Sequence, residues 1–400
     1  SQAGMLRVLA YTVQAGLLGL VAYNALTSLW GWRVPPAASP GERRRRFRVV
    51  VPAHNEEGVV GNLLADLAAQ AYDSESASVW VVADRCRDRT AAVARRWAQV
   101  AERREGAEGK GAALAWYLDR HPLEPGESLL VIDADNRVPA QFLARLSDEL
   151  DAGHQVLQAY LDVANPDDSW VATASALSYW ASNRMVQLAR RNLGWSSDLG
   201  GTGMCLTSEA LLAAGGFAGS LAEDQELTAR LVLEGIPVVW LHDLRVRDEK
   251  PADIGVAVRQ RARWTKGWSR VARRHVDPLL RDGLARRSLG PVDLALRLVQ
   301  PSRTGVAATS AALAVGGAAF RGGLLLPWQI WTGAAALQFF LPLAFLARER
   351  VPGRYLVRYP VLAVLAVLWL PVRVLSAAPG RAWYHTPHGG RLPNPPPKGD

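Results

Sequence analysis

Long apolar stretches lie toward both ends of the chain, and between them apolar and polar positions alternate in short runs. Residues 6–32 carry a single charge, Arg7, and exceed the roughly 20 apolar residues that a helix needs to cross a bilayer. Further apolar segments lie near residues 305–320, 324–346 and 356–375, and the first of these is short and glycine-rich. This pattern predicts a membrane protein whose middle part folds as a soluble domain.

The middle part, from about residue 47 to residue 246, alternates short apolar runs with amphipathic stretches. Alternation of this kind predicts an α/β fold with a doubly wound, mostly parallel sheet, whose ligands bind beyond the carboxyl ends of the strands. The predicted strands are 48–52, 79–83, 129–132 and 156–161, and the predicted helices are 59–70, 90–100, 112–118 and 141–150.

A strongly basic segment, residues 253–275, follows this domain. Trp264, Trp268 and Val271 recur at the spacing of one helical face, with arginine and lysine residues around them. An apolar stripe edged by cations is typical of a helix that lies in the membrane interface. An ordinary surface helix is the alternative.

The net charge of +9 comes mainly from arginines beside the apolar segments, such as Arg43 to Arg46 after the first one. Arginine at such positions favours the cytoplasmic side, so we expect an inner-membrane protein whose middle domain faces the cytoplasm. The first apolar segment is then an uncleaved anchor, and a cleaved signal peptide is the alternative. The middle part carries no nucleic-acid-binding motif, so nucleic acid is not an expected partner. Cys86 and Cys205 stand alone, which argues against a disulfide or a zinc site.

Two predicted strands end in polar residues that can contact a nucleotide. The first breaks at Pro52 into a turn that contains Glu56, although a glutamate there can also be a favourable charge in a first helical turn. The second is followed by Asp84, whose carboxylate can hydrogen-bond a ribose or a base edge.

Asp133 and Asp135 follow the uninterrupted apolar run 129–132. Side chains two apart on a strand project to the same face, as chelation of Mg²⁺ or Mn²⁺ with a diphosphate requires. Paired acids in a surface turn are the alternative. Lys110 lies between two glycines just before a predicted helix, which suits an anion, and a flexible loop is the alternative there.

Two later segments supply candidates for ligand binding and proton transfer. Gly201-Thr202-Gly203 offers a tight backbone surface that a ligand can approach, or simply a packing turn. Ser220 and Glu223 have the spacing of a helix capping box, which leaves Asp224 free to act as a general base. On the basic helix, arginine can pair with phosphate and tryptophan can stack on a ring. The candidates there are Gln260, Arg263 and Trp264.

Taken in order, these motifs resemble those of the family 2 glycosyltransferases, over about residues 47–268. The matching motifs are Pro52 to Glu57, Asp84, Gly109-Lys110-Gly111, Asp133-Ala-Asp135, Glu223-Asp224 and Gln260-x-x-Arg263-Trp264. Longer strings, such as Asn165 to Trp170 and Asp248 to Pro251, are similar to the exopolysaccharide-synthesis branch of that family.

The resemblance implies a GT-A fold and an inverting transfer from a nucleotide-sugar, with a UDP-sugar expected, to a glycan or lipid-linked acceptor. It implies that Asp224 is the base, that Asp133 and Asp135 bind the nucleotide and a Mn²⁺ or Mg²⁺ ion, and that Lys110 approaches the phosphates. The other implied donor contacts are Pro52, Glu56, Asp84, Gln260, Arg263 and Trp264. The expected acceptor contacts are Gly201, Thr202, Gly203, Glu223 and Trp264.

The sequence leaves further partners and an alternative function open. Subunits of a polysaccharide export system are possible partners, and a catalytically inactive scaffold subunit of such a system is the alternative function. One amino-terminal membrane segment and a small carboxyl-terminal bundle depart from the processive synthases, so the number of sugars added stays open.

The expected boundaries divide the chain into a membrane anchor, a catalytic domain and a membrane-associated carboxyl-terminal part. They are a transmembrane helix at 5–33, a basic linker at 34–46, the GT-A domain at 47–250, interfacial helices at 251–300, transmembrane helices at 301–378 and a flexible tail at 379–400.

Overall fold

The computed structural model describes residues 2–319 and 323–363. They form two compact units, which we describe separately. The α/β unit comprises residues 36–164 and 198–251, and the helical unit comprises the described residues of 2–35, 165–197 and 252–363.

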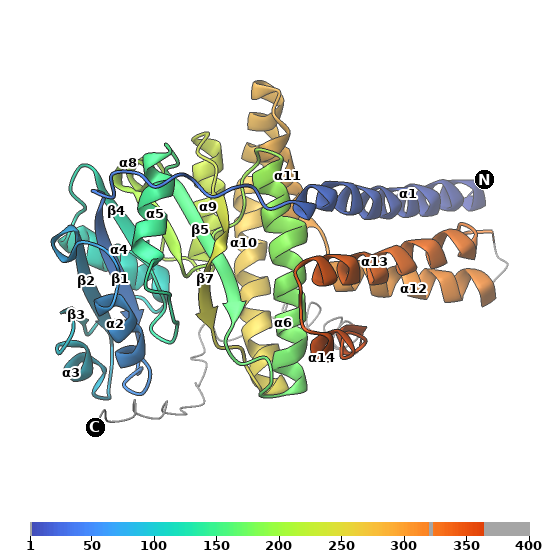
Figure 1. Ribbon diagram of the computed structural model, residues 1–400. Helices are drawn as coiled ribbons and strands as arrows, with labels where there is room; N and C mark the ends of the chain where they lie inside the picture. The colour runs from blue at the N-terminus through green and yellow to red at the C-terminus, as the bar shows by residue number, and fades with distance from the viewer. Residues whose placement is uncertain (1, 320–322, 364–400) are drawn as a thin grey trace. The chain divides into compact units, whose positions relative to one another are not determined.

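A seven-stranded sheet forms the centre of the α/β unit, in the order β3-β2-β1-β4-β6-β5-β7 (Figure 1). The first four strands in this order are parallel, β6 runs antiparallel to both neighbours, and β5 is parallel to β7. The mostly parallel sheet is therefore confirmed. The strands are β1 (Arg46–Ala53), β2 (Ala77–Asp84), β3 (Gln99–Arg103), β4 (Glu127–Val131), β5 (Val156–Val163), β6 (Met204–Thr207) and β7 (Val239–Asp248).

Both faces of the sheet are covered by helices, which explains the unbroken apolar run of β1. Val49 and Val51 point into one core with α2 (Val60–Ala68) and α5 (Phe142–Asp151). Val50 points into the opposite core with α4 (Lys110–Arg120), α8 (Ser208–Ala213) and α9 (Glu223–Leu233).

One predicted element is wrong over half its length. The helix expected at 90–100 is α3 (Thr90–Ala94), and the chain then enters strand β3 at Gln99. This strand pairs with β2 at the edge of the sheet, from Trp80 to Asp84. An edge strand needs no continuous apolar pattern, because one side of its backbone and part of its side chains face solvent.

The helical unit begins with α1 (Gln2–Ser28) and a short 3₁₀ helix, η1 (Leu29–Trp32). Val21 of α1 packs with Val306 of α12 (Arg303–Ala319) and with Trp331 of α13 (Trp328–Arg348). The remaining helices are α6 (Trp170–Ser182), the π-helix η3 (Asn183–Leu188), α7 (Ala189–Asn192), α10 (Ile254–Arg286), α11 (Leu289–Val299) and α14 (Gly353–Leu356).

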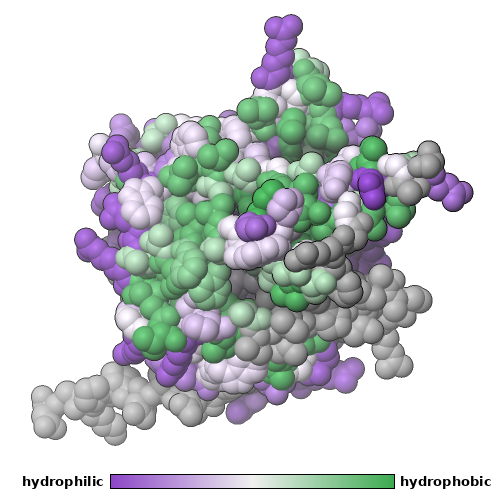
Figure 2. Space-filling view, turned by 90° about the vertical axis from the view of Figure 1, so that its right-hand side faces the viewer, coloured by the Kyte–Doolittle hydropathy of each residue, from purple (hydrophilic) through white to green (hydrophobic). Residues whose placement is uncertain are grey.

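Among the described residues, two helices are long and apolar enough to cross a membrane, Gly4–Trp32 and α13. Large exposed apolar side chains lie along both of them, and Figure 2 shows apolar surface spread over this face of the protein. The predicted helix at 305–320 is present as α12, which has 17 described residues and is not one of these two helices. Most of the segment 356–375, and the tail 379–400, lie outside the described residues.

Candidate active site

Strands β2 and β4 and the antiparallel strand β6 bring several candidate residues of the α/β unit to the same end of the sheet. Asp84 ends β2, and Asp133 lies just beyond the end of β4. Because β6 runs antiparallel to β4, with Met204 opposite Val131, the glycine-rich segment that precedes β6 begins at this edge. The carboxyl ends of the strands are where a sheet of this type binds its ligands.

Lys110, the first residue of α4, links two of these segments. Its Nζ donates to the carboxylate of Asp133 and, at 2.6 Å, to the carbonyl oxygen of Gly201. Burial works to lower the pKa of Lys110, but the charges of Asp133 and Glu223 outweigh it, so its pKa is raised. The ammonium group therefore stays charged between Asp133 and Gly201.

Asp224, in the first turn of α9, also lies close to Gly201. A Cβ atom at Gly201 would lie 3.5 Å from Nζ of Lys110 and 3.6 Å from Oδ2 of Asp224, so the glycine leaves open space between these groups. Burial and repulsion by Glu223 raise the pKa of Asp224 to about 7, although the N–H of Gln225 and the charge of Lys110 oppose the shift. A carboxyl group with this pKa can accept a proton near neutral pH.

The turn that carries Asp133 and Asp135 is braced by Asn136, which the sequence analysis missed. Asn136 is fully buried, and its Nδ2 donates to Asp135 at 3.0 Å and to Asp248 at 3.3 Å. Its Oδ1 accepts the hydroxyl of Thr202 at 2.5 Å, and this hydroxyl in turn accepts the N–H of Asp133 at 3.0 Å. The only sequence signal for Asn136 was its position directly after Asp135.

These hydrogen bonds hold the side chain of Thr202 inside the protein, whereas the sequence predicted that it contacts the acceptor. Thr202 is 3% exposed, and its hydroxyl is used inside the protein in both directions. Thr202 therefore holds the 133–136 turn, and contact with an acceptor stays a prediction for Gly201, Thr202, Gly203 and Glu223.

Asn136→Ala tests this brace by its effect on stability. Removing the amide leaves the buried Thr202 hydroxyl without its acceptor, which we expect to lower the free energy of unfolding by about 2–3 kcal/mol. Chemical denaturation of the detergent-purified protein measures the change. The matched control is Asn62→Ala on α2, which we expect to change stability by less than about 1 kcal/mol. Equal losses in the two variants would contradict the assignment.

The loops after β1 and β2 are joined by hydrogen bonds. The N–H groups of Glu56 and Glu57 donate to Thr90 Oγ1 at 2.7 Å and to Asp88 Oδ2 at 3.0 Å. Burial works to raise the pKa of Asp88, but hydrogen bonds from Thr90 outweigh it, so its pKa is lowered. Pro52 lies within β1 just before this paired loop.

Asp84 is more enclosed than expected, at 6% exposure. Its carboxylate accepts hydrogen bonds from Arg103 at 2.7 Å and from Arg85 at 3.0 Å. A nucleotide contact by this carboxylate therefore stays a prediction, and it requires at least one arginine to share or release the group.

The predicted capping box is wrong. Helix α9 begins at Glu223 with Ala222 at its N-cap position and without a side-chain cap. The hydroxyl of Ser220 is buried and has no hydrogen-bond partner, because the chain turns at Leu221 and Ala222 before the helix starts. Glu223 therefore does not cap the helix. It lies against Gly111 instead, and a Cβ atom added at Gly111 would come within 2.8 Å of the Cβ of Glu223.

Gln260, Arg263 and Trp264 lie on α10, in the helical unit, and all three are partly exposed. The predicted helix at 253–275 is confirmed, and it continues to Arg286. The Asp253 side chain caps it by accepting the N–H of Val256 at 2.9 Å. Contacts of these three residues with donor or acceptor stay predictions.

The side chains that could bind a metal ion here are suited to Mg²⁺ or Mn²⁺, but they are few. Within residues 2–319 and 323–363, no group of three or more His, Cys, Asp or Glu side chains is arranged to hold a metal ion. Asp133 and Asp135 supply carboxylate oxygens, the ligands that Mg²⁺ and Mn²⁺ prefer, and Mg²⁺ commonly uses one or two carboxylates plus substrate phosphates and water. These two residues fit such an ion when a diphosphate provides further ligands.

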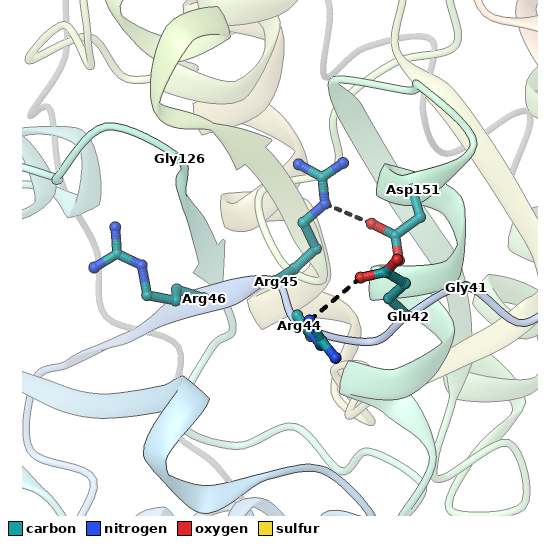
Figure 3. A pocket seen from close by; sticks show the side chains of 7 residues that line it. All are labelled: Gly41, Glu42, Arg44, Arg45, Arg46, Gly126 and Asp151. Atoms are coloured by element: carbon teal, nitrogen blue, oxygen red, sulfur yellow. Dashed lines mark hydrogen bonds and ion pairs between the residues drawn. The ribbon is translucent and has the colours of Figure 1, made fainter.

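A separate pocket lies at the opposite edge of the sheet, where β1 and β4 begin (Figure 3). It is lined by Gly41, Glu42, Arg44, Arg45, Arg46, Gly126 and Asp151. Three arginines of the basic linker pair with carboxylates of the α/β unit here, Arg43 with Asp148, Arg45 with Asp151, and Arg46 with Glu124. Three of the four arginines that follow the first apolar segment are therefore paired within this unit.

Comparison with known proteins gives the same assignment as the motifs. A family model described as "Glycosyltransferase like family 2" matches residues 44–267. A β-monoglucosyldiacylglycerol synthase of Synechocystis sp. is 29% identical over 236 residues, which are 55% of this chain and 47% of the relative. An N-acetylglucosaminyltransferase of Rhizobium leguminosarum bv. viciae is 24% identical over 235 residues, 54% of each chain. The chain thus spans about half the length of the curated relatives it matches.

Among solved structures, a mannosyltransferase from Pyrobaculum calidifontis in complex with GDP-Man and Mn²⁺ is similar with a TM-score of 0.61. The two sequences are 22% identical, and the match covers 90% of this chain and 99% of the other. At this identity the similarity supports the fold.

Proposed function

Because the chain belongs to glycosyltransferase-like family 2, we propose that it transfers a sugar from a nucleotide-sugar, with inversion, to a hydroxyl group of a lipid or lipid-linked glycan at a membrane. The observation that carries this proposal is the meeting of Lys110, Asp133 and Asp224 around Gly201. A cation, a carboxylate suited to an ion and a carboxylate with a raised pKa are the groups that this reaction needs in one place.

In the proposed reaction, the oxygen of the acceptor hydroxyl attacks the anomeric carbon of the sugar. Asp224 accepts the proton that this hydroxyl loses. The new carbon–oxygen bond forms on the face opposite the diphosphate, while the bond to the diphosphate oxygen breaks and its electron pair stays on the leaving group. Attack from the opposite face inverts the configuration. The ammonium of Lys110 is placed to stabilise the negative charge on the leaving diphosphate.

Asp133 and Asp135 would hold Mg²⁺ or Mn²⁺ together with the donor diphosphate. The ion, when bound, stabilises the charge that develops on the departing diphosphate. Asn136 contributes by fixing Asp135 through its amide.

The remaining donor contacts are proposed from the family resemblance. The loop from Pro52 to Glu56 and the end of β2 at Asp84 would bind the nucleoside. Gln260, Arg263 and Trp264 would hold the diphosphate and the acceptor sugar.

A lipid acceptor at the membrane is supported by two features. Gly4–Trp32 and α13 are apolar enough to cross a membrane, and one matching relative is a glycolipid synthase. An exopolysaccharide acceptor and partner subunits of an export system form the second version of the acceptor proposal, supported by the sequence strings around residues 165–170 and 248–251.

The direct test is nucleotide release by the detergent-purified protein. UDP- and GDP-sugars are supplied one at a time with Mn²⁺ or Mg²⁺ and with diacylglycerol or a lipid-linked glycan, and the product is sized. We expect one donor class to give acceptor-dependent release of nucleoside diphosphate. Absence of release and of donor binding across the whole panel would favour the catalytically inactive scaffold subunit instead.

Gly201 and Gly203 provide a matched pair of variants that separates function from packing. Both have positive φ, +82° and +61°, so alanine is strained at either position. A Cβ at Gly203 would also meet Val246 Cγ2 at 2.6 Å, so we expect Gly203→Ala to lose about 2–4 kcal/mol of stability.

Gly201→Ala places a methyl group between Lys110 and Asp224 at ordinary contact distances, so its extra cost in stability is smaller. We expect it to lower kcat/KM by at least about tenfold while unfolding at a higher denaturant concentration than Gly203→Ala. Denaturant titration and steady-state kinetics measure the two effects. The reverse order of stabilities, or full activity in Gly201→Ala, would contradict the placement of this glycine.

A further inference from the structure

Lys110 is paired with Asp133, a carboxylate that is also proposed as a metal ligand. Nζ of Lys110 donates to Asp133, which is one of the two carboxylates proposed for the ion, and to the carbonyl of Gly201. The pair is partly exposed, at 21% for the lysine side chain and 36% for the aspartate side chain, so ligands can reach it.

A divalent ion that enters this site alone meets two obstacles. The described residues offer no group of three or more His, Cys, Asp or Glu side chains that could hold it, and it has to displace or approach an ammonium group already paired with Asp133. Two cations beside one carboxylate repel each other, and the displaced ammonium would be left partly buried without its partner.

A nucleoside diphosphate removes both obstacles together. Its phosphate oxygens supply the missing metal ligands, and they also offer the ammonium of Lys110 a new anionic partner. Gly201 leaves space for this movement, since a Cβ atom there would be 3.5 Å from Nζ of Lys110.

We propose that Lys110 acts as an internal counter-ion that holds Asp133 until a nucleoside diphosphate arrives, so that metal and nucleotide bind as an interdependent pair. This inference rests on the proposed function. Lys110 thereby has two states, one paired with Asp133 and Gly201 and one paired with phosphate. Linkage requires the dependence to be mutual, because each ligand strengthens the other by the same factor.

The test measures Mn²⁺ binding rather than turnover. Free Mn²⁺ is followed by electron paramagnetic resonance during titration of the full chain in detergent, with and without UDP or GDP. For the wild-type protein we expect weak binding of Mn²⁺ alone and binding at least about tenfold tighter with the nucleotide that the protein accepts. Equal affinity with and without that nucleotide would overturn the inference.

The Lys110→Met variant tests whether the ammonium group competes with the metal ion for Asp133. Loss of the competing ammonium should raise the affinity of the nucleotide-free protein for Mn²⁺ by about tenfold and reduce the gain that nucleotide brings. Lys110→Arg keeps the charge and should behave like the wild type in the nucleotide-free titration. Lys110→Gln repeats the neutral substitution in case the methionine variant fails to fold. Lys266→Met, on α10, controls for loss of a lysine elsewhere.

The outcomes separate this inference from the proposed function. If the wild type binds UDP or GDP, but the neutral variants bind Mn²⁺ alone no more tightly than the wild type does, then the counter-ion role is wrong and the transferase proposal stands. If no nucleoside diphosphate binds in any condition, both are overturned.

Discussion

Asp224→Asn should abolish most of the transfer activity while leaving donor binding in place. General base catalysis contributes about 10²–10⁴-fold to a rate, and asparagine is close in shape to aspartate but cannot take the acceptor proton. We therefore expect kcat to fall by about 10³-fold, with a nucleotide affinity within about threefold of the wild type. Steady-state kinetics and calorimetric titration of nucleoside diphosphate measure the two quantities.

The matched control lies on the same helix. Glu234 is exposed at the carboxyl-terminal end of α9, so Glu234→Gln removes a charge from that helix without touching the site. We expect it to keep full activity. Turnover of Asp224→Asn that stays within a few-fold of the wild type would refute the base assignment.

The pH profile adds a second check on Asp224. Its pKa is about 7, and the base must be deprotonated to act, so kcat/KM should rise with pH and level off above about 7. The charge of Lys110 lowers this pKa, so Lys110→Met should move the rising limb to higher pH. A limb at the same pH in both proteins would show that another group controls it.

Stability should change with pH in the opposite direction. The folded-state pKa of Asp224 is raised above its usual value of 3.8, so the folded protein holds the proton over a range where the unfolded chain has lost it. The contribution of this group to stability is therefore present below about pH 4 and is lost as the pH rises toward 7. Asp224→Asn should remove that loss, which makes the variant more stable than the wild type above pH 7.

The sequence alone predicts the strands that are buried on both faces of the sheet. The apolar runs of β1, β2, β4 and β5 were predicted, because a strand covered on both faces has no reason to alternate. β6 was missed, because it has only four residues behind a glycine-rich turn and is defined by pairing with β4 and β5. β7 was missed as well, and its register shifts between Ala159 and Tyr160 of its partner β5.

Some residues of the candidate site could likewise be predicted from the sequence, and others could not. Acids at strand ends, such as Asp133, are visible in the sequence because the strand before them is visible. Asn136 was not predicted, because its importance depends on contacts with Thr202 and Asp248, which are distant in sequence. The cap assigned to Ser220 failed for the converse reason, since a local spacing rule ignored the turn that sets the start of α9.

Removing the divalent ion should have an effect as large as losing the base. The two protein ligands proposed for it are Asp133 and Asp135, and of these Asp135 is the cleaner to test, because Asp133 also holds Lys110. Stabilising the charge on a leaving diphosphate is worth several kcal/mol, so we expect excess EDTA to lower the rate by about 10³-fold and added Mn²⁺ to restore it. We expect Asp135→Asn to lower the rate by about as much at ordinary Mn²⁺ concentrations.

Recovery with metal separates a lost ligand from a damaged fold. If Asp135 binds the ion, then Asp135→Asn should regain part of its rate as Mn²⁺ is raised, because Asp133 and the diphosphate still offer oxygens. The matched control is Asp243→Asn, which removes a carboxylate that pairs with Arg145 at 2.7 Å and should leave the metal dependence unchanged. Full turnover of the wild type in excess chelator would show that the carboxylates beyond β4 bind the nucleotide without an ion. The charge of Lys110 would then be the main stabilisation that the α/β unit offers the leaving group.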